Sequence, residues 1–171
     1  ESLKVLRHKL FAPTKAQEWD KLADGGKRMQ FAMGATGRKT DGDEHLVTPE
    51  RRYRPGGYGW DTLSPREGFD GGVRDADDAA FRLDLPNGRY QVRCRFRSDD
   101  GQPHRMAMYI NGKRAGKPFI VPNASELEQQ WQAFVPDETL ILVIHSLDRG
   151  ENRHWVWSDC TVEQIGERDA Q

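Results

Sequence analysis

Two segments of the chain place aromatic side chains beside basic and acidic ones. The segment at 51–61 reads RRYRPGGYGWD, and the segment at 148–157 reads DRGENRHWVW. A flat aromatic ring can lie against the C–H face of a sugar, while neighbouring polar side chains hydrogen-bond hydroxyl groups. Arginine can also form a forked pair with a uronate carboxylate or a sulfate. The residues predicted to bind a ligand in this way are Tyr53, Tyr58, Trp60, Asp148, Arg153, His154 and Trp155.

The same combination of rings and guanidinium groups can bind single-stranded nucleic acid by stacking. The charge balance argues against that ligand, because 26 Lys and Arg stand against 27 Asp and Glu, a formal net charge of -1. Nucleic-acid-binding domains normally carry a strong basic excess. No apolar run approaches the ~18–20 residues that a membrane-spanning helix needs. We therefore expect neither a nucleic-acid partner nor a membrane span.

Acidic residues gather in the segment DGDE at 41–44. Carboxylates are the hard oxygen ligands that Ca²⁺ prefers, so Asp41, Asp43 and Glu44 are candidate ligands of a structural calcium ion. Their spacing does not match an EF-hand loop, and a solvated acidic loop is the alternative. The sequence indicates no other cofactor.

Cys94 and Cys160 are the two cysteines of the chain. Two thiols are too few for a cysteine-rich zinc site or for a scaffold of several disulfides. They can form one bridge, or they can remain two buried free thiols. The residues alone leave both alternatives open.

Catalytic motifs are missing from the sequence. It contains no G-x-S-x-G elbow, no H-E-x-x-H and no phosphate-binding glycine loop. Its five histidines include no closely spaced pair on one predicted strand or helix. An enzyme would need a convergent cluster, which Tyr58, Arg153 and His154 could supply. A small polysaccharide hydrolase or lyase is therefore one alternative reading of the chain.

From residue 79 onward the chain alternates apolar and polar residues with the period of β-strands. Strands are expected at 79–85, 89–96, 105–110, 117–121, 131–135, 139–147 and 154–165. Turn residues separate them, most clearly Pro86-Asn87-Gly88. Short strands at this spacing predict an all-β fold, a sandwich or barrel, and the βαβ units of a parallel sheet are absent.

The chain divides into a main domain with two flanking parts. The expected divisions are an N-terminal extension at 1–28, a β-sandwich domain at 29–165 and a tail at 166–171. A short helix is expected at about 14–23, because Thr14 and Gln17 fit a capping box and Gly25 fits a helix stop. The glycine-rich stretch at 34–78 has no clear periodicity and is predicted to form long functional loops or a disordered insert.

The sequences of two expected strands predict which of their side chains are buried. The strand at 139–147 is apolar on both faces, as expected for a central strand that is covered on both sides. In the last strand, one alternate set of residues looks like core; its members are Val156, Ser158, Cys160 and Val162. The other set, with Trp155 and Trp157, is then expected to form a more polar face or the end of the sheet.

Several segments together resemble a known family. They are Val47-Thr48-Pro49, Gly57-Tyr58-Gly59-Trp60, the hairpin FRLDLPNGRYQV at 81–92, Tyr109-Ile110-Asn111-Gly112, and Trp155-x-Trp157-Ser158-x-Cys160 in the last strand. In this order they resemble the galactose-binding-like, malectin-like β-sandwich domains attached to bacterial polysaccharide lyases, agarases and esterases. The resemblance implies a jelly-roll β-sandwich and an extracellular or periplasmic setting. It also implies an accessory role beside a covalently linked catalytic domain.

The first functional hypothesis is a non-catalytic carbohydrate-binding module that holds a polysaccharide or oligosaccharide with loops at one end of the sandwich. This hypothesis requires the rings of Tyr58, Trp60 and Trp155 to project from a single rim into solvent. The alternative is an interdomain or protein-interaction β-sandwich that no longer binds sugar. In that case Trp155 would be buried against another domain.

Overall fold

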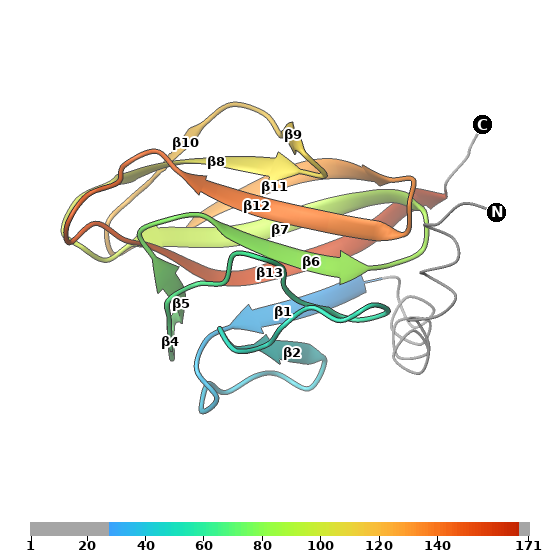
Figure 1. The fold of residues 1–171 in the computed structure, drawn as a ribbon, viewed down its shortest axis with the longest axis horizontal. Coiled ribbons are helices and arrows are strands. Elements are labelled where there is room, and N and C mark those ends of the chain that lie inside the picture. Colours follow the sequence, from blue (N-terminus) through green and yellow to red (C-terminus); the bar gives the residue numbers. More distant parts are fainter. Residues whose placement is uncertain (1–27, 168–171) are drawn as a thin grey trace.

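The computed structural model describes residues 28–167, which fold into a sandwich of two β-sheets (Figure 1). The strands are β1 (Arg28–Met33), β2 (Glu44–Val47), β3 (Tyr58–Trp60), β4 (Glu67–Phe69), β5 (Gly72–Asp75), β6 (Ala79–Asp84), β7 (Gly88–Ser98), β8 (His104–Ile110), β9 (Lys113–Arg114), β10 (Phe119–Val121), β11 (Leu127–Val135), β12 (Thr139–Ser146) and β13 (Trp155–Glu167). The described residues contain no helix, so the prediction of an all-β fold is confirmed for them. The helix expected at 14–23 lies outside the described residues. In the described part of the chain, no helix is long and apolar enough to cross a bilayer.

The two sheets have different strand orders. Sheet A runs β11-β7-β13-β1-β2, with β5 paired to β13 and β4 paired to β5. Sheet B runs β10-β8-β12-β6-β3, with β9 paired to β8. Among the named strands, β1 and β2 are parallel and the other pairings are antiparallel. The long central strands β7, β12 and β13 therefore give both sheets their framework.

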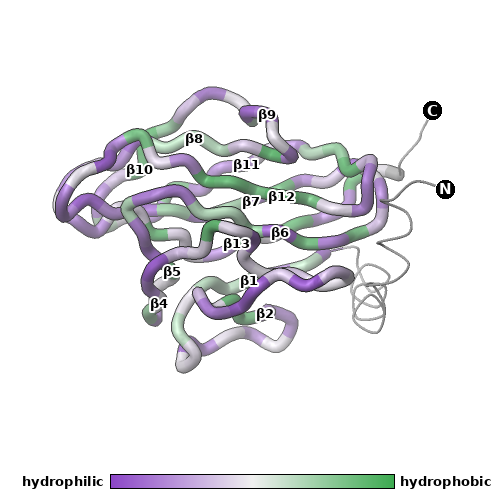
Figure 2. Tube along the Cα trace, viewed as in Figure 1, coloured by the Kyte–Doolittle hydropathy of each residue, from purple (hydrophilic) through white to green (hydrophobic). Residues whose placement is uncertain are grey.

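Strand β7 shows how the alternating sequence produces the sandwich. Its inward side chains are fully buried; they are Tyr90, Val92, Cys94 and Phe96. The residues between them are half-buried or exposed on the outer face of sheet A. Because successive strand residues point to opposite faces, this alternation places one face of β7 against the core. Figure 2 shows the same alternation of hydropathy along the strands.

The stretch at 34–78, predicted to form loops, contains four short strands instead. They are β2, β3, β4 and β5, and none is longer than four residues. Each pairs with a strand distant in sequence or with its immediate neighbour, as Tyr58 does with Leu83 of β6. Strands this short carry too few residues for a period of two to be recognised. Their position depends on the partner strand rather than on local sequence.

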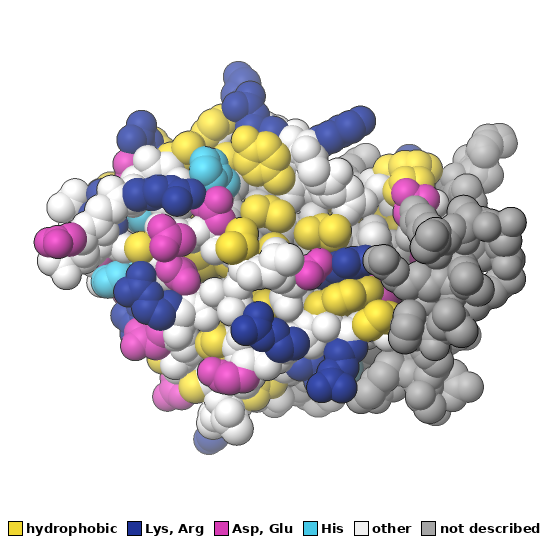
Figure 3. Space-filling view, viewed as in Figure 1, with side chains coloured by type: hydrophobic (Ala, Val, Ile, Leu, Met, Phe, Trp, Pro, Cys, Tyr) yellow, Lys and Arg dark blue, Asp and Glu magenta, His cyan; other side chains and the backbone are white. Residues whose placement is uncertain are grey.

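Strand β12 lies in the middle of sheet B, between β8 and β6, as its apolar sequence predicted. Its inner residues Leu140, Leu142 and Ile144 are fully buried. Ile141 and Val143 on the outer face are only half-buried. Figure 3 looks onto this outer face and shows hydrophobic side chains in the middle with charged ones around them. Within the described residues, the prediction that β12 is covered on both sides is therefore wrong.

A β-bulge in β13 corrects the prediction for the last strand. The register against β7 shifts between Trp157 and Asp159, so Ser158 is one extra residue in the ladder. An extra residue reverses the alternation, and Trp155 and Trp157 before it point into the core together with Cys160 after it. All three are 0% exposed. The prediction that Trp155 and Trp157 lie on a more polar face is wrong.

Aromatic rings fill the centre of the space between the sheets. The ring centroid of Trp157 lies 5.7 Å from that of Trp60, 5.3 Å from Phe96 and 6.2 Å from Phe81. Each of these side chains is at most 1% exposed. Tilted and edge-on ring pairs at such distances add stabilisation beyond the burial of apolar area. This cluster is the core on which β3, β6, β7 and β13 meet.

The two cysteines face each other across β7 and β13. Cys94 pairs with Cys160 in the strand register, and their Sγ atoms lie 3.6 Å apart. A disulfide requires about 2.05 Å between the sulfurs. The structure therefore has two buried free thiols, and these pack as part of the apolar core.

Asp159, directly after the bulge, makes stability depend on pH. Burial raises its pKa to about 6, and the charge of Arg95 offsets this only in part. Because the folded-state pKa lies above the ordinary value, the native protein binds this proton more tightly than the unfolded chain does. The stability that the native protein gains from binding this proton is fully present below about pH 4, and it is lost as the pH rises through 6.

The substitution Asp159→Asn is expected to remove the loss of stability at higher pH, because the amide carries no charge. At about pH 7.5 the variant should be more stable than the wild type by about 1–2 kcal/mol, a value reduced because the carboxylate is partly solvated. At about pH 4.5 the two proteins should differ little. Urea unfolding at both pH values measures the difference. An equal change in stability at both would contradict the raised pKa.

Candidate functional site

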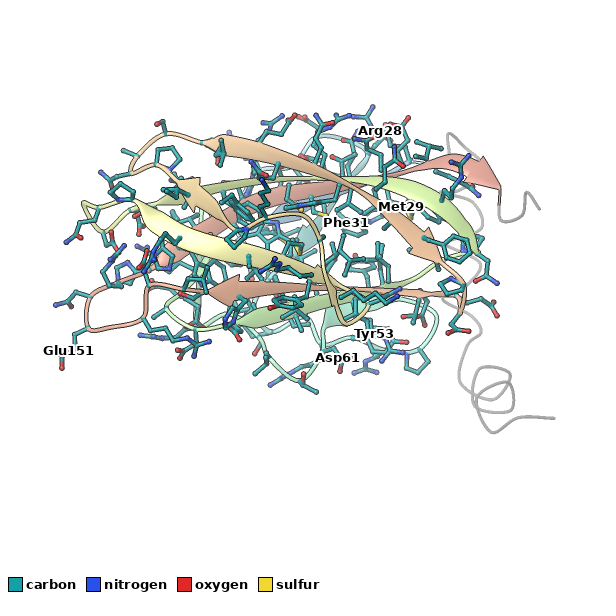
Figure 4. The ribbon with its side chains drawn as sticks, turned by 90° about the horizontal axis from the view of Figure 1, so that it is seen from above. Arg28, Met29, Phe31, Tyr53, Asp61 and Glu151 are labelled. Carbon is teal, nitrogen blue, oxygen red and sulfur yellow. The ribbon has the colours of Figure 1, made fainter. Side chains whose placement is uncertain are left out.

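The predicted ligand residues lie at two opposite ends of the sandwich. Tyr58 pairs with the end of β6 that lies beside Thr139, the first residue of β12. The loop at 147–154 follows the other end of β12. Figure 4 shows the separation, with Glu151 in that loop and Tyr53 toward the opposite end. The single rim that the first hypothesis requires is not formed.

At the far end, polar groups of the 147–154 loop bind strand β8 and the loop that carries Asp100. Asp148 accepts hydrogen bonds from the Arg105 backbone N–H at 2.7 Å and from its guanidinium at 2.7 and 3.0 Å, which lower the pKa of Asp148 to about 2. The carboxylate of Asp100 accepts from Arg153 Nε and from the His154 N–H, each at 2.8 Å. Burial raises the pKa of Asp100, but its hydrogen bonds outweigh burial and lower it to about 2. These groups hold the loops together.

The cluster that an enzyme would need is not formed. Tyr58 is at one end of the sandwich, while Arg153 and His154 are at the other. A pocket of about 250 Å³ lies beside His154, but the charges around it are already paired, as Arg74 Nε is with Glu67 at 2.7 Å. The three residues cannot act on one substrate group.

Trp60 and Trp155 are buried, so their predicted exposure is corrected. Trp60 is 1% exposed and its Nε1–H donates to the Thr48 carbonyl at 2.9 Å. Trp155 is 0% exposed and its Nε1–H donates to the Asp77 carbonyl at 2.7 Å. A buried indole whose N–H has a partner is a stable core residue. Neither ring presents a face on which a sugar could stack.

The two tyrosines are half-buried, and a guanidinium covers one face of each ring. Arg82 Cζ lies 4.2 Å from the ring centroid of Tyr53, and Arg51 Cζ lies 4.0 Å from that of Tyr58. The Tyr53 hydroxyl donates to Asp84 Oδ2 at 2.6 Å. Burial, followed by this hydrogen bond, raises the pKa of Tyr53. Cation–π contacts of this kind occupy the ring face that a sugar would need.

Around Tyr58 the chain forms a pocket of about 350 Å³ that we call the arginine pocket. Its lining residues are Glu50, Arg51, Arg52, Arg54, Gly57 and Tyr58. Arg51 Nε donates to the Tyr58 carbonyl at 3.2 Å, which fixes that guanidinium. Arg52 and Arg54 are exposed. Three cationic side chains against one carboxylate make this pocket electropositive.

Two contacts hold the loop that carries the arginine pocket. Gly59 has φ +154, and a Cβ there would lie 2.5 Å from the backbone of both Arg52 and Tyr53. Glycine therefore lets β3 approach the 51–53 segment closely. On the other side, Asp84 Oδ2 accepts the Gly56 N–H at 2.7 Å. The pocket is thus fixed by the core strands and not by the loop alone.

A larger groove, of about 540 Å³, lies between the β8–β9 hairpin and the β11–β12 turn. We call it the hairpin groove; its lining residues include Ile110, Lys113, Arg114, Gln132, Phe134 and Ile141. Asn111 fixes the hairpin against β12, because its Nδ2 donates to the Thr139 carbonyl at 3.2 Å and its Oδ1 accepts the Ile141 N–H at 2.7 Å. The groove therefore has a rigid wall on the side of sheet B.

Phe134 is the aromatic residue that the sequence analysis missed. It is 52% exposed, whereas its strand neighbours Ala133 and Val135 are buried. The signal was present, because Phe134 shares the outer side of an alternating strand with Gln132. Because this ring also lines the hairpin groove, Phe134 is a candidate contact residue for a ligand there.

The acidic segment at 41–44 does not bring three potential metal ligands together in the described structure. In residues 28–167, no three His, Cys, Asp or Glu side chains gather where they could hold an ion. Glu44 Oε1 accepts the backbone N–H of Asp41 at 2.9 Å and so closes the turn before β2. The prediction that Asp41, Asp43 and Glu44 ligate calcium is therefore not supported, and these residues form a polar turn.

Comparison with known proteins finds likeness in structure and not in sequence. No protein-family model matches the chain, and no curated protein matches it. Part of β-glucuronidase 2 from Bacteroides uniformis superposes with a TM-score of 0.61 at 15% identity, covering 82% of this chain and 18% of that chain. The likeness shows a shared fold. This chain spans less than a fifth of that enzyme.

Two smaller domains superpose less closely. The EclA C-terminal domain, a sugar-binding protein, has a TM-score of 0.48 at 8% identity, covering 53% of this chain and 76% of that one. The CBM36-1 domain of a multidomain xylanase from the hindgut metagenome of Trinervitermes trinervoides has a TM-score of 0.46 at 15% identity, covering 63% and 86%.

Proposed function

We propose that the protein is a non-catalytic carbohydrate-binding module with a jelly-roll, galactose-binding-like topology. In this proposal it is covalently linked to a polysaccharide-degrading catalytic domain and works outside the cell or in the periplasm. The sequence resemblance and the fold shared with part of a β-glucuronidase support it. The ligand is a polysaccharide or oligosaccharide.

The hairpin groove carries the proposal. It is open to solvent, and Phe134 offers a ring that is 52% exposed. Lys113, Arg114 and Gln132 are exposed beside it and can hydrogen-bond sugar hydroxyls. A ring for the apolar face of a sugar and donors for its hydroxyls are the two requirements of such a site. Shallow sites of this type bind with affinities of about micromolar to millimolar.

The test is binding of polysaccharides by wild type and Phe134→Ala, measured by affinity electrophoresis and calorimetry. Loss of a stacked ring should weaken binding roughly tenfold. Ile120→Ala is the matched control, because Ile120 is 60% exposed but lies on β10, outside the groove. Its binding should equal that of wild type. Equal binding of polysaccharide by both variants would show that the hairpin groove is not the binding site.

The second candidate is an interdomain or protein-interaction module. It is favoured by the outer face of sheet B, where Tyr109, Ile141 and Val143 lie half-buried around the middle of the sheet. Apolar residues on an outer sheet face are typical of a surface that a partner covers. A wild-type protein that binds no polysaccharide of a broad panel would favour this candidate.

A further inference from the structure

The arginine pocket has unused positive charge. Arg52 and Arg54 are exposed, and neither makes an ion pair with a carboxylate of the described residues. Other arginines of that part of the chain do form ion pairs, as Arg105 does with Asp148 at 2.7 Å. Two unpaired guanidinium groups that line one pocket can bind an anion, since each offers a fork of donors.

The pocket is also held in shape before any ligand arrives. Arg51 is fixed over Tyr58 at 4.0 Å and donates to its carbonyl. Asp84 and the close approach at Gly59 fix the loop from two sides. Little backbone freedom of the loop is then lost when an anion binds, and such preorganisation increases affinity. Glu50 is the carboxylate among the lining residues, and it repels any anionic group of a ligand that comes close to it.

The arginine pocket and the hairpin groove lie at the same end of sheet B. The strands β3, β6, β12 and β8 are consecutive neighbours in that sheet. Tyr58 of the pocket lies on β3, and Ile110 of the groove lies on β8. Three strand spacings, about 14 Å across the sheet, separate β3 from β8. An extended sugar chain is long enough to reach both.

We propose that the arginine pocket binds the carboxylate or sulfate group of an acidic sugar, so that the preferred ligand is an acidic polysaccharide. This inference rests on the proposed function and adds its ligand class. Arg52 and Arg54 form charge-assisted hydrogen bonds to the oxyanion, and a planar carboxylate can take both N–H groups of one fork. Neutral sugar residues of the same chain remain in the hairpin groove.

The experiment compares three proteins on neutral xylan, polygalacturonate and a sulfated carrageenan. They are wild type, Arg52→Gln/Arg54→Gln, and a control of equal charge change, Lys39→Gln/Lys117→Gln, whose residues are exposed and line neither pocket nor groove. Wild type should bind an acidic chain roughly tenfold more tightly than xylan at low salt. The arginine variant should lose that preference while its xylan binding is unchanged. The control should keep it.

The two acidic probes distinguish a carboxylate ligand from a sulfate ligand by which polysaccharide binds more tightly, and inorganic sulfate should compete with either one for the same guanidinium groups. Equal losses in the arginine variant and the control would overturn the inference, because net charge would then explain them. Binding of xylan with no preference for acidic chains would also overturn it and leave the proposed function standing. Absence of binding to every polysaccharide would overturn the proposed function itself.

Discussion

Replacing Trp157 with alanine is expected to remove a large part of the stability of the protein. The indole is 0% exposed and contacts the rings of Trp60 and Phe96 at 5.7 and 5.3 Å. Truncation of a fully buried aromatic side chain costs about 3–5 kcal/mol, against a total stability of about 5–15 kcal/mol for a domain. Urea unfolding followed by circular dichroism should show a much lower midpoint.

Trp131→Ala is the control for this prediction. Trp131 is half-buried on β11, at the edge of sheet A, and its ring lies 5.8 Å from that of Phe119. Its removal should cost less, about 1–2 kcal/mol, because water can reach the space that the ring leaves. If Trp157→Ala lost no more stability than Trp131→Ala, the central ring cluster would not be the core of the sandwich.

Asp84→Ala should destabilise the protein and deform the arginine pocket together. The carboxylate is 5% exposed and accepts from the Tyr53 hydroxyl at 2.6 Å and from the Gly56 N–H at 2.7 Å. Without it, two donors lose their acceptor, which costs about 2–4 kcal/mol. Because these donors hold the loop at 53–56, binding of acidic polysaccharide should weaken as well. Urea unfolding and calorimetry measure the two effects.

Tyr53→Phe separates the two hydrogen bonds of Asp84. This variant keeps the ring under Arg82 and removes only the hydroxyl, so it should lose about 1 kcal/mol. The bond from Gly56 stays in place, and the arginine pocket should keep its shape. Equal losses in Tyr53→Phe and Asp84→Ala would mean that the Gly56 bond does not hold the loop.

The strands β6, β7, β8, β11, β12 and β13 could be predicted from sequence because, at six to thirteen residues, they are long enough to show an alternating pattern. In β7, eleven residues alternate without interruption. The strands β2 to β5 could not be predicted, since three or four residues do not define a period. They form because partner strands supply hydrogen bonds to them, as β6 does for β3. Tertiary pairing of this kind is not visible in local sequence.

The candidate site was harder to predict than the fold. Trp60 stands between glycine-rich segments that have the composition of a loop, yet its ring is 1% exposed. Its burial depends on Trp157, which is distant in sequence. Phe134 was overlooked because its strand reads as an ordinary alternating one. Arg52 and Arg54 were found as part of a basic segment, but only the structure shows that no described carboxylate neutralises them.

The extra residue at Ser158 also restricts how this chain can vary by insertion or deletion. Removing it would shift the residues on one side of the deletion by one position along β13. Side chains on one side of the gap would keep their orientation, and those on the other side would exchange core for solvent. Either the indoles of Trp155 and Trp157 or the thiol of Cys160 would turn outward. Related chains of this fold should therefore tolerate length changes in their loops far better than at this position.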